Sequence, residues 1–147
     1  MPATTNILVP LDGSELAEGA VDVAIDIARP AGGKLTLFVA AEPDATRALA
    51  EYADSEGITS AMATNAYLAQ LAERVRSRGV AAEQTSSDGT NVAEEIVDQA
   101  AAAGATMIVL TSHGRSGIGR WLLGSVADKV ARSATVPVVI VPCQGRG

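Results

Sequence analysis

Short apolar runs alternate with longer segments of helical periodicity along the chain. The apolar runs predict strands at residues 6–9, 35–41, 80–85, 106–110 and 136–141. Pro10 is expected to stop the first strand, because proline has no N–H group to donate to a sheet. Residues 35–41 are all apolar or Thr, which indicates a strand buried on both faces, whereas residues 80–85 predict a weak strand at or near a sheet edge.

Helices are predicted between these strands. Ser14 and Asn91 precede helical segments as capping residues, and Glu94 stands where a capping box needs an acid. Gly79 and Gly104 stand where helix C-termini favour glycine. The predicted helices cover residues 14–29, 59–78, 91–104 and 125–133.

The helical periodicity also predicts which side chains face the sheet. They are Leu16, Ala20, Val23, Ala24 and Ile27 in the first helix, Ala61, Leu68, Leu71, Ala72 and Val75 in the second, and Val92, Ile96 and Ala100 in the third. Residues 42–58 are mixed, acidic and alanine-rich, and they predict an excursion or the frayed start of a helix.

The alternation of strands and helices predicts an α/β fold, a doubly wound five-stranded parallel sheet with helices on both faces. Short connections and right-handed crossovers favour the strand order 3-2-1-4-5. No repeat, low-complexity tract or linker divides residues 1–147, which predicts a single domain. Hydrophobic residues make up 48% of the chain and only four residues are aromatic, so we expect an aliphatic core.

The charge distribution changes along the chain. The net charge is −6, but residues 1–110 carry six Lys or Arg against sixteen Asp or Glu, whereas residues 111–147 carry five against one. An acidic chain argues against general nucleic-acid binding. The basic C-terminal part points to a small bound anion, with helix C-terminal cations or a chance fluctuation as equally good alternatives.

Cysteine content and hydropathy bear on the compartment. A single cysteine, Cys143, excludes an internal disulfide and a thiolate zinc cluster, which is compatible with a reducing compartment. The N-terminal residues lack the basic and apolar segments of a signal peptide, and no apolar run approaches the ~20 residues of a membrane span. We therefore expect a soluble, cytoplasmic protein that binds neither nucleic acid nor membranes.

Residues 111–125 (TSHGRSGIGRWLLGS) contain four glycines and follow the fourth predicted strand. In the order 3-2-1-4-5 this loop faces Asp12, at the end of the first strand, across the crevice where the winding reverses. Glycines let a backbone approach a ligand, and their N–H groups form an anion nest. A helix N-terminus at Gly124 and Ser125 adds further donors. We expect phosphate here; the alternative is a mobile surface loop whose serine caps the helix.

Standard nucleotide motifs do not fit the spacing. A P-loop needs Lys followed by Ser or Thr, but Lys34 is followed by Leu35. Gly117 and Gly119 begin like a dinucleotide fingerprint, but Leu122 stands at the position of its third glycine. That fingerprint also follows the first strand of its fold, whereas this loop follows the fourth. A receiver domain needs several carboxylates at the sheet, but only Asp12 lies at the end of the first strand. A flavodoxin has a Ser, Thr or Gly loop for phosphate after that strand, whereas this chain carries Asp12, Glu15 and Glu18 there, which would repel phosphate.

Gly114, nine further residues, and then Gly124 and Ser125 resemble the loop of the ATP-binding branch of the universal stress protein family. That family's pattern is Gly, two residues, Gly, nine residues, Gly and then Ser or Thr. The resemblance spans the chain, and its other matching segments are residues 6–14 (NILVPLDGS), 125–130 (SVADKV) and 136–139 (VPVV). Thr111 departs from the pattern, because it stands at the family's first glycine and adds a Cβ and a hydroxyl beside the ribose and phosphates.

The resemblance, together with the chemistry of the loop, implies a set of nucleotide-binding residues at strand ends and along the loop. They are Pro10, Leu11, Asp12, Ala40, Leu110, Thr111, His113, Gly114, Arg115, Gly117, Gly124, Ser125 and Val126. The first three would line the adenosine pocket, and the backbone of Ala40 would meet adenine. Leu110, Thr111, His113 and Gly114 would border the ribose and phosphates, which residues 124–126 would hold. Instead of contacting the ligand, Asp12 could cap the first helix together with Ser14. Arg115 could be a solvent-exposed charge instead of a phosphate ligand.

The resemblance implies a Rossmann-like fold related to the adenine nucleotide alpha hydrolases. It also implies ATP, AMP or ADP as ligand, with Mg²⁺ expected beside a triphosphate. His113 is the only histidine, and no evident nucleophile or paired carboxylate accompanies it in the sequence, so we expect no dedicated catalytic machinery. The sequence thus predicts a nucleotide-binding, stress-response regulatory module. The alternatives are a slow ATP hydrolase, a true nucleotidyl transferase or hydrolase, and an interaction module whose pocket is empty.

Residues 136–141 (VPVVIV) carry no charge and are expected at an open sheet edge. An uncovered apolar edge favours pairing with another chain, and a twofold axis would close the assembly at two subunits. The sequence therefore predicts a homodimer through this strand, which the family resemblance also implies, together with an unknown protein partner.

Overall fold

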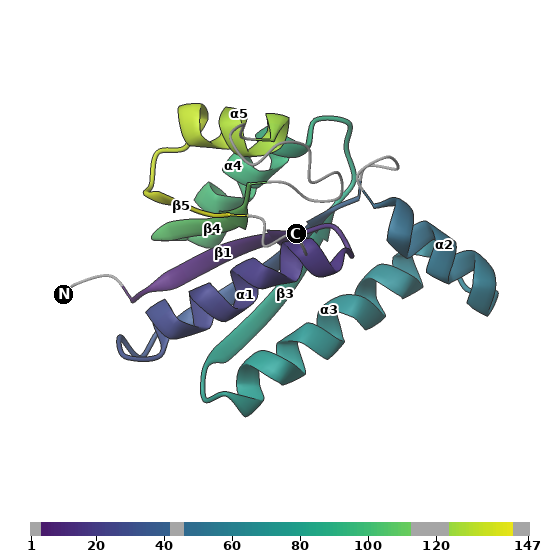
Figure 1. Ribbon diagram of the computed structural model, residues 1–147, viewed down its shortest axis with the longest axis horizontal. Coiled ribbons are helices and arrows are strands. Elements are labelled where there is room, and N and C mark those ends of the chain that lie inside the picture. Colours follow the sequence, from purple (N-terminus) through teal and green to yellow (C-terminus); the bar gives the residue numbers. More distant parts are fainter. Residues whose placement is uncertain (1–3, 42–45, 113–123, 143–147) are drawn as a thin grey trace.

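A computed structural model describes residues 4–41, 46–112 and 124–142 of the chain. Within these ranges there are five strands and five helices around one parallel sheet (Figure 1). The strands are β1 (Asn6–Leu11), β2 (Lys34–Ala40), β3 (Ala81–Ser87), β4 (Met107–Thr111) and β5 (Val138–Val141). The helices are α1 (Glu15–Ala28), α2 (Arg47–Glu56), α3 (Ser60–Ser77), α4 (Val92–Ala103) and α5 (Ser125–Ser133). The predicted fold class and the strand order β3-β2-β1-β4-β5 are confirmed.

Two layers of helices cover the sheet. Figure 1 shows α1, α2 and α3 on one face and α4 and α5 on the other. Alternate residues of β1 enter the two cores: Ile7 and Val9 pack with α1 and α3, and Leu8 packs with α4 and α5. β2 is buried on both faces as predicted, from Leu35 to Ala40.

Pro10 does not end the first strand. β1 continues to Leu11, and Pro10 is in register with Phe38 of β2. The pairing of β1 with β4 covers only Ile7 and Leu8, so beyond Leu8 that side of β1 has no ladder for a missing N–H group to interrupt. The prediction was wrong because the cost of a proline depends on where the neighbouring strand ends.

Helix α2 occupies the stretch in which the sequence predicted only an excursion or a frayed helix start. It is ten residues long, and its buried residues are Leu49 and Ala53, which lie one turn apart. Two buried residues on a short helix do not form an extended apolar stripe, so the sequence lacks the 3.6-residue hydrophobic periodicity by which longer helices are recognised.

The buried faces of α1 and α3 differ in part from the predicted ones. In α1, Val21 and Ile25 are fully buried, whereas the predicted Val23 and Ile27 are only partly buried. In α3 the predicted Ala61 is exposed. Neighbouring stripes of these helices carry similar apolar side chains, so periodicity alone does not choose between them and packing against the sheet does.

The predicted caps of α1 and α4 are confirmed. The N–H group of Ala17 donates to Ser14 Oγ at 3.2 Å, and the N–H group of Glu94 donates to Asn91 Oδ1 at 3.1 Å. Gly104 ends α4 in the left-handed conformation. No helix in the described part of the chain is long and apolar enough to cross a membrane.

The sheet edges are formed by β3 and β5. β3 was predicted at an edge, which is confirmed. β5 begins at Val138, two residues later than predicted, and the carbonyl of Pro137 accepts a hydrogen bond from the N–H group of Ile108 at 2.9 Å. At the amino end of the sheet, the buried side chain of Asn6 accepts a hydrogen bond from the Thr36 hydroxyl at 2.9 Å. The polar groups of these two residues are therefore used within the fold.

Candidate functional site

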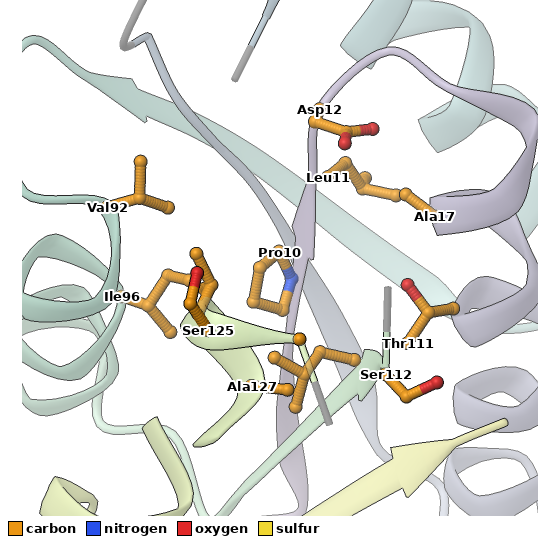
Figure 2. A pocket seen from close by; sticks show the side chains of 13 residues that line it. Pro10, Leu11, Asp12, Ala17, Val92, Ile96, Thr111, Ser112, Ser125 and Ala127 are labelled. Carbon is orange, nitrogen blue, oxygen red and sulfur yellow. The ribbon is translucent and has the colours of Figure 1, made fainter. Parts of the chain in front are cut away.

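A cavity of about 210 Å³ opens at the carboxyl ends of β1 and β4 (Figure 2). The chain leaves β1 towards β2 on one side of the sheet and continues from β4 to β5 on the other, so the winding reverses here. The described lining residues are Pro10, Leu11, Asp12, Ala17, Val92, Ile96, Leu110, Thr111, Ser112, Gly124, Ser125, Val126 and Ala127.

Much of the predicted nucleotide-binding set meets at this cavity. Its members on the wall are Pro10, Leu11, Asp12, Leu110, Thr111, Gly124, Ser125 and Val126. Ala40 is buried at the carboxyl end of β2 and is not a lining residue, although its neighbour Val39 is in register with Leu11 of the wall. The predicted residues that lie outside the described part of the chain are His113, Gly114, Arg115 and Gly117.

Sequence reasoning missed five of the described lining residues: Ala17, Val92, Ile96, Ser112 and Ala127. Val92 and Ile96 were expected only as core residues of α4. Figure 2 shows them on one side of Pro10, with Thr111 and Ser112 on the other. Apolar residues at helical spacing carry no ligand signature; their position opposite the end of β1 becomes visible only once the two elements are packed together.

Asp12 shapes the turn between β1 and α1 and also lines the cavity. Its Oδ1 atom accepts a hydrogen bond from the N–H group of Ser14 at 2.9 Å, as in an Asx turn. Gly13 between them has a φ of +90°, which L side chains rarely adopt. The Asp12 carboxylate can therefore hold the turn before α1 and face the cavity at the same time.

The first N–H groups of α5 line the cavity, and the described part of the chain supplies no acceptor for them. Gly124 is the N-cap and Ser125 is the first residue of the helix, so the capping role that the sequence offered for Ser125 is wrong. The N–H group of Gly124 donates to the Ser112 carbonyl at 2.7 Å, and that of Asp128 donates to the Gly124 carbonyl at 2.9 Å. Among the described residues, no acceptor meets the N–H groups of residues 125–127, all of which line the cavity.

These donors and the helix dipole favour a bound anion at this wall. Hydroxyl groups are supplied by Thr111, Ser112 and Ser125, and Asp12 is the only carboxylate among the described lining residues. A carboxylate repels phosphate but accepts hydrogen bonds from hydroxyl or amino groups. The arrangement therefore suits a ligand that is anionic at one end and a hydrogen-bond donor elsewhere.

Part of the basic charge of the C-terminal region is used within α5. Arg132 Nε donates to both carboxylate oxygens of Asp128 at 3.1 Å, on the exposed surface of the helix. Arg132 lies in the last turn, as the alternative of a helix C-terminal cation predicted. In the described ranges, no group of three His, Cys, Asp or Glu side chains is arranged to hold a metal ion.

Sequence comparison relates the chain to known proteins. Residues 3–142 match the universal stress protein family. Universal stress protein YxiE of Bacillus subtilis is 31% identical over 151 residues, which cover 92% of this chain and 97% of the relative. Universal stress protein Rv2005c of Mycobacterium tuberculosis is 35% identical over 95% of this chain and 46% of its own length.

Solved structures show the same architecture. A universal stress protein in complex with cAMP superposes with a TM-score of 0.69 at 29% identity, covering 97% of this chain and 99% of the other. The universal stress protein UspA from Lactobacillus plantarum superposes with a TM-score of 0.72 at 26% identity, covering 95% and 99%. With a family match over nearly its whole length and this doubly wound fold, the chain belongs to the universal stress protein family.

Proposed function

We propose that the chain is a regulatory module that binds an adenine nucleotide, ATP before ADP or AMP, in the cavity between β1 and β4. The observation that carries the proposal is the row of N–H groups at residues 125–127, which meet no acceptor among the described residues and line a cavity where the winding of the sheet reverses. Backbone donors at a helix N-terminus bind phosphate without any special side chain.

The remaining wall suits a nucleoside. Pro10, Leu11 and Val92 offer apolar surface to a flat base, and Asp12 offers an acceptor to a ribose hydroxyl or an adenine amino group. We place adenine beside the backbone of Ala40, as the family resemblance implies. The cavity of about 210 Å³ is smaller than the roughly 300 Å³ at which most ligand pockets begin, so the nucleoside would fill it while the phosphates extend over α5.

One structural relative supports the ligand class, because the universal stress protein of 29% identity was solved in complex with cAMP. We extend this to ATP because the N-terminus of α5 can serve more than one phosphate. Mg²⁺ would accompany a triphosphate. The described wall supplies hydroxyl groups but no cluster of carboxylates, so phosphate oxygens and water would be the main ligands of that ion.

A regulatory role is proposed instead of catalysis because Asp12 is the one titratable side chain on the described wall. General acid–base catalysis normally positions a group with a tuned pKa, and often a partner for it, beside the reacting atoms. In our proposal, nucleotide binding changes the conformation of a surface that an unknown protein partner binds.

The test is nucleotide binding by protein purified without added nucleotide. Native mass spectrometry would show any retained ligand, and calorimetry with ATP, ADP, AMP and cAMP would rank their affinities. We expect one adenine nucleotide per chain, with ATP bound most tightly and recovered intact after hours. Absence of binding for all four would overturn the proposal, and rapid conversion of ATP to ADP would replace the regulatory module by an enzyme.

We also propose that two chains pair through β5. This strand is an open edge next to β4, and its four residues are uncharged and only partly buried. Unpaired N–H and C=O groups on such an edge favour a short antiparallel match with a second copy, and a twofold axis limits the assembly to two chains.

A further inference from the structure

A second cavity, of about 260 Å³, lies between the start of α1 and the helices α2 and α3, which Figure 1 shows on the same side of the sheet. No sequence motif pointed to it. The described lining residues are Gly13, Glu18, Ala48, Leu49, Tyr52, Ala63, Ala66, Tyr67 and Gln70. The chain has only two tyrosines, and both lie on this wall.

Glu18 is the only charged residue on the described wall. Its side chain is 24% exposed, and Oε1 receives one long hydrogen bond from Arg74 Nη1 at 3.4 Å. Arg74 approaches Asp22 more closely, at 3.1 Å, and does not line the cavity. Because a carboxylate has about four lone-pair sites, Glu18 retains capacity for a ligand that donates hydrogen bonds.

Two aromatic rings face the same space. Tyr52 is 49% exposed, whereas the hydroxyl oxygen of Tyr67 is buried beside the Glu18 carboxylate and the Gly13 backbone, with no hydrogen bond of normal geometry among the described residues. Burial, followed by the nearby carboxylates of Glu18 and Asp12, raises the pKa of Tyr67 far above its usual range. The tyrosine is therefore neutral, and the field that acts on it is negative.

We propose that this second cavity binds a small organic ammonium ion, with its charge against the Glu18 carboxylate and the tyrosine rings. Carboxylates and aromatic faces both attract cations that carry carbon groups. Leu49 and the alanines of α2 and α3 give apolar contact for the carbon chain, and the Gln70 amide oxygen can accept one ammonium N–H. An anion finds no Lys or Arg on the described wall.

The second cavity is close to the nucleotide cavity but separate from it. Asp12 lines the first and Gly13 lines the second, so the turn between β1 and α1 is their common boundary. The inference does not depend on nucleotide binding, because none of its recognition groups belongs to the first cavity.

Tyrosine labelling provides a direct test. In protein with ¹³C-labelled tyrosine, both ring signals report on this cavity, and titration with n-butylammonium chloride is compared with titration by 1-butanol. We expect saturable shifts of both rings, with the ammonium ion binding about tenfold more tightly than the alcohol, as one charge-assisted hydrogen bond predicts. Equal affinity of the two compounds, or no saturable shift, would overturn the proposal.

Two matched variants identify the charge that acts. Glu18→Gln should weaken butylammonium binding about tenfold. Asp26→Asn should leave it unchanged, because Asp26 is an exposed acid of the same helix that lines neither cavity. Equal weakening by both would overturn the role of Glu18. If circular dichroism shows that Glu18→Gln is unfolded, Tyr52→Ala on the exposed side of the cavity replaces it, and unchanged ammonium affinity there counts against the site.

Discussion

Leu49 of α2 packs directly on Gly13 in the turn after β1, so closely that a Cβ atom on Gly13 would lie 2.7 Å from Leu49 Cγ. Leu49 is buried in the core shared by β1, α1 and α3. The contact therefore connects a helix that lacks a long apolar stripe with the turn that presents Asp12 to the cavity between β1 and β4.

Gly13→Ala should destabilise the protein by about 3 kcal/mol, because it combines left-handed strain with overpacking against Leu49. Gly32→Ala is the matched control, since Gly32 also has a positive φ, of 65°, but nothing lies within 4 Å of an added Cβ. The control should lose about 1 kcal/mol from strain alone. Urea denaturation measures both; equal losses would mean that Leu49 yields to the methyl group without cost.

Gly124→Val should abolish ATP binding in calorimetry while the protein stays folded. Gly124 has a φ of −63°, which valine adopts easily, but its branched side chain would stand where phosphate approaches the N-terminus of α5. Gly19→Val on the exposed side of α1 is the control, because an added Cβ there meets nothing within 4 Å. Unchanged ATP affinity in a folded Gly124→Val protein would show that the phosphates bind elsewhere.

Ser125→Ala separates ligand contact from helix capping. Because Gly124 is the N-cap, the substitution should leave the free energy of unfolding nearly unchanged. It should weaken ATP binding by about 1 kcal/mol through the loss of one hydroxyl hydrogen bond to phosphate. Thermal melts and calorimetry give the two values. A loss of stability at constant affinity would contradict this assignment and restore a capping role.

Tyr67→Phe should remove a loss of stability at alkaline pH. The pKa of Tyr67 is raised in the folded protein from its ordinary value of 10.0, mainly by burial. Below pH 10 the hydroxyl is protonated in both states; above it, the unfolded chain loses the proton first, so the free energy of unfolding falls as pH rises, by up to about 1.4 kcal/mol per pH unit.

Urea midpoints at pH 8, 10 and 11 measure the effect. The wild type and Tyr52→Phe, the control on the exposed ring, should both show the steep fall, and Tyr67→Phe should be flatter. At neutral pH, Tyr67→Phe should cost little, because the hydroxyl that it removes has no hydrogen-bond partner of normal geometry among the described residues. Parallel curves for all three proteins would refute the assignment.

Val139→Lys should convert the proposed dimer to a monomer, as measured by light scattering at micromolar concentration. Lysine on the edge strand β5 places a charge where two copies would meet. Gln84→Lys on β3, at the opposite edge of the sheet, is the control and should remain dimeric. Val139 also packs against the core, so a melting curve must show that the variant folds. A wild-type monomer, or a dimer that survives the lysine, excludes this interface.

Features governed by local chemistry were predictable from the sequence. Ser14 and Asn91 cap their helices through side-chain bonds to an N–H group three residues ahead, and such bonds need no knowledge of the rest of the fold. The strand order followed from general rules of connection. The buried face of α1 was only partly predictable, because the choice of Val21 over Val23 is made by the sheet beneath the helix.

The candidate site was predictable to a similar extent. Asp12 follows β1, and Gly124 precedes the helix that comes after β4. Because β1 and β4 are neighbours where the winding reverses, the topology places both residues on one wall. Ile96 looked like an ordinary core residue, and it lines the cavity because α4 packs against β2 and α5, next to the end of β1. The second cavity depends on α2, which the sequence did not reveal, so neither tyrosine could be assigned to it in advance.

The hydrogen bond from the Gly124 N–H group to the Ser112 carbonyl joins the two described ends of the glycine-rich stretch at 2.7 Å. This bond connects the end of β4 to the start of α5 directly, through two residues that flank positions 113–123. Loop closure costs only about 0.6 kcal/mol more for each doubling of length, so the number of residues between Ser112 and Gly124 has little effect on the free energy of this junction. The frame thus holds the junction together by itself, which leaves the composition of the residues between Ser112 and Gly124 to be set by the proposed ligand.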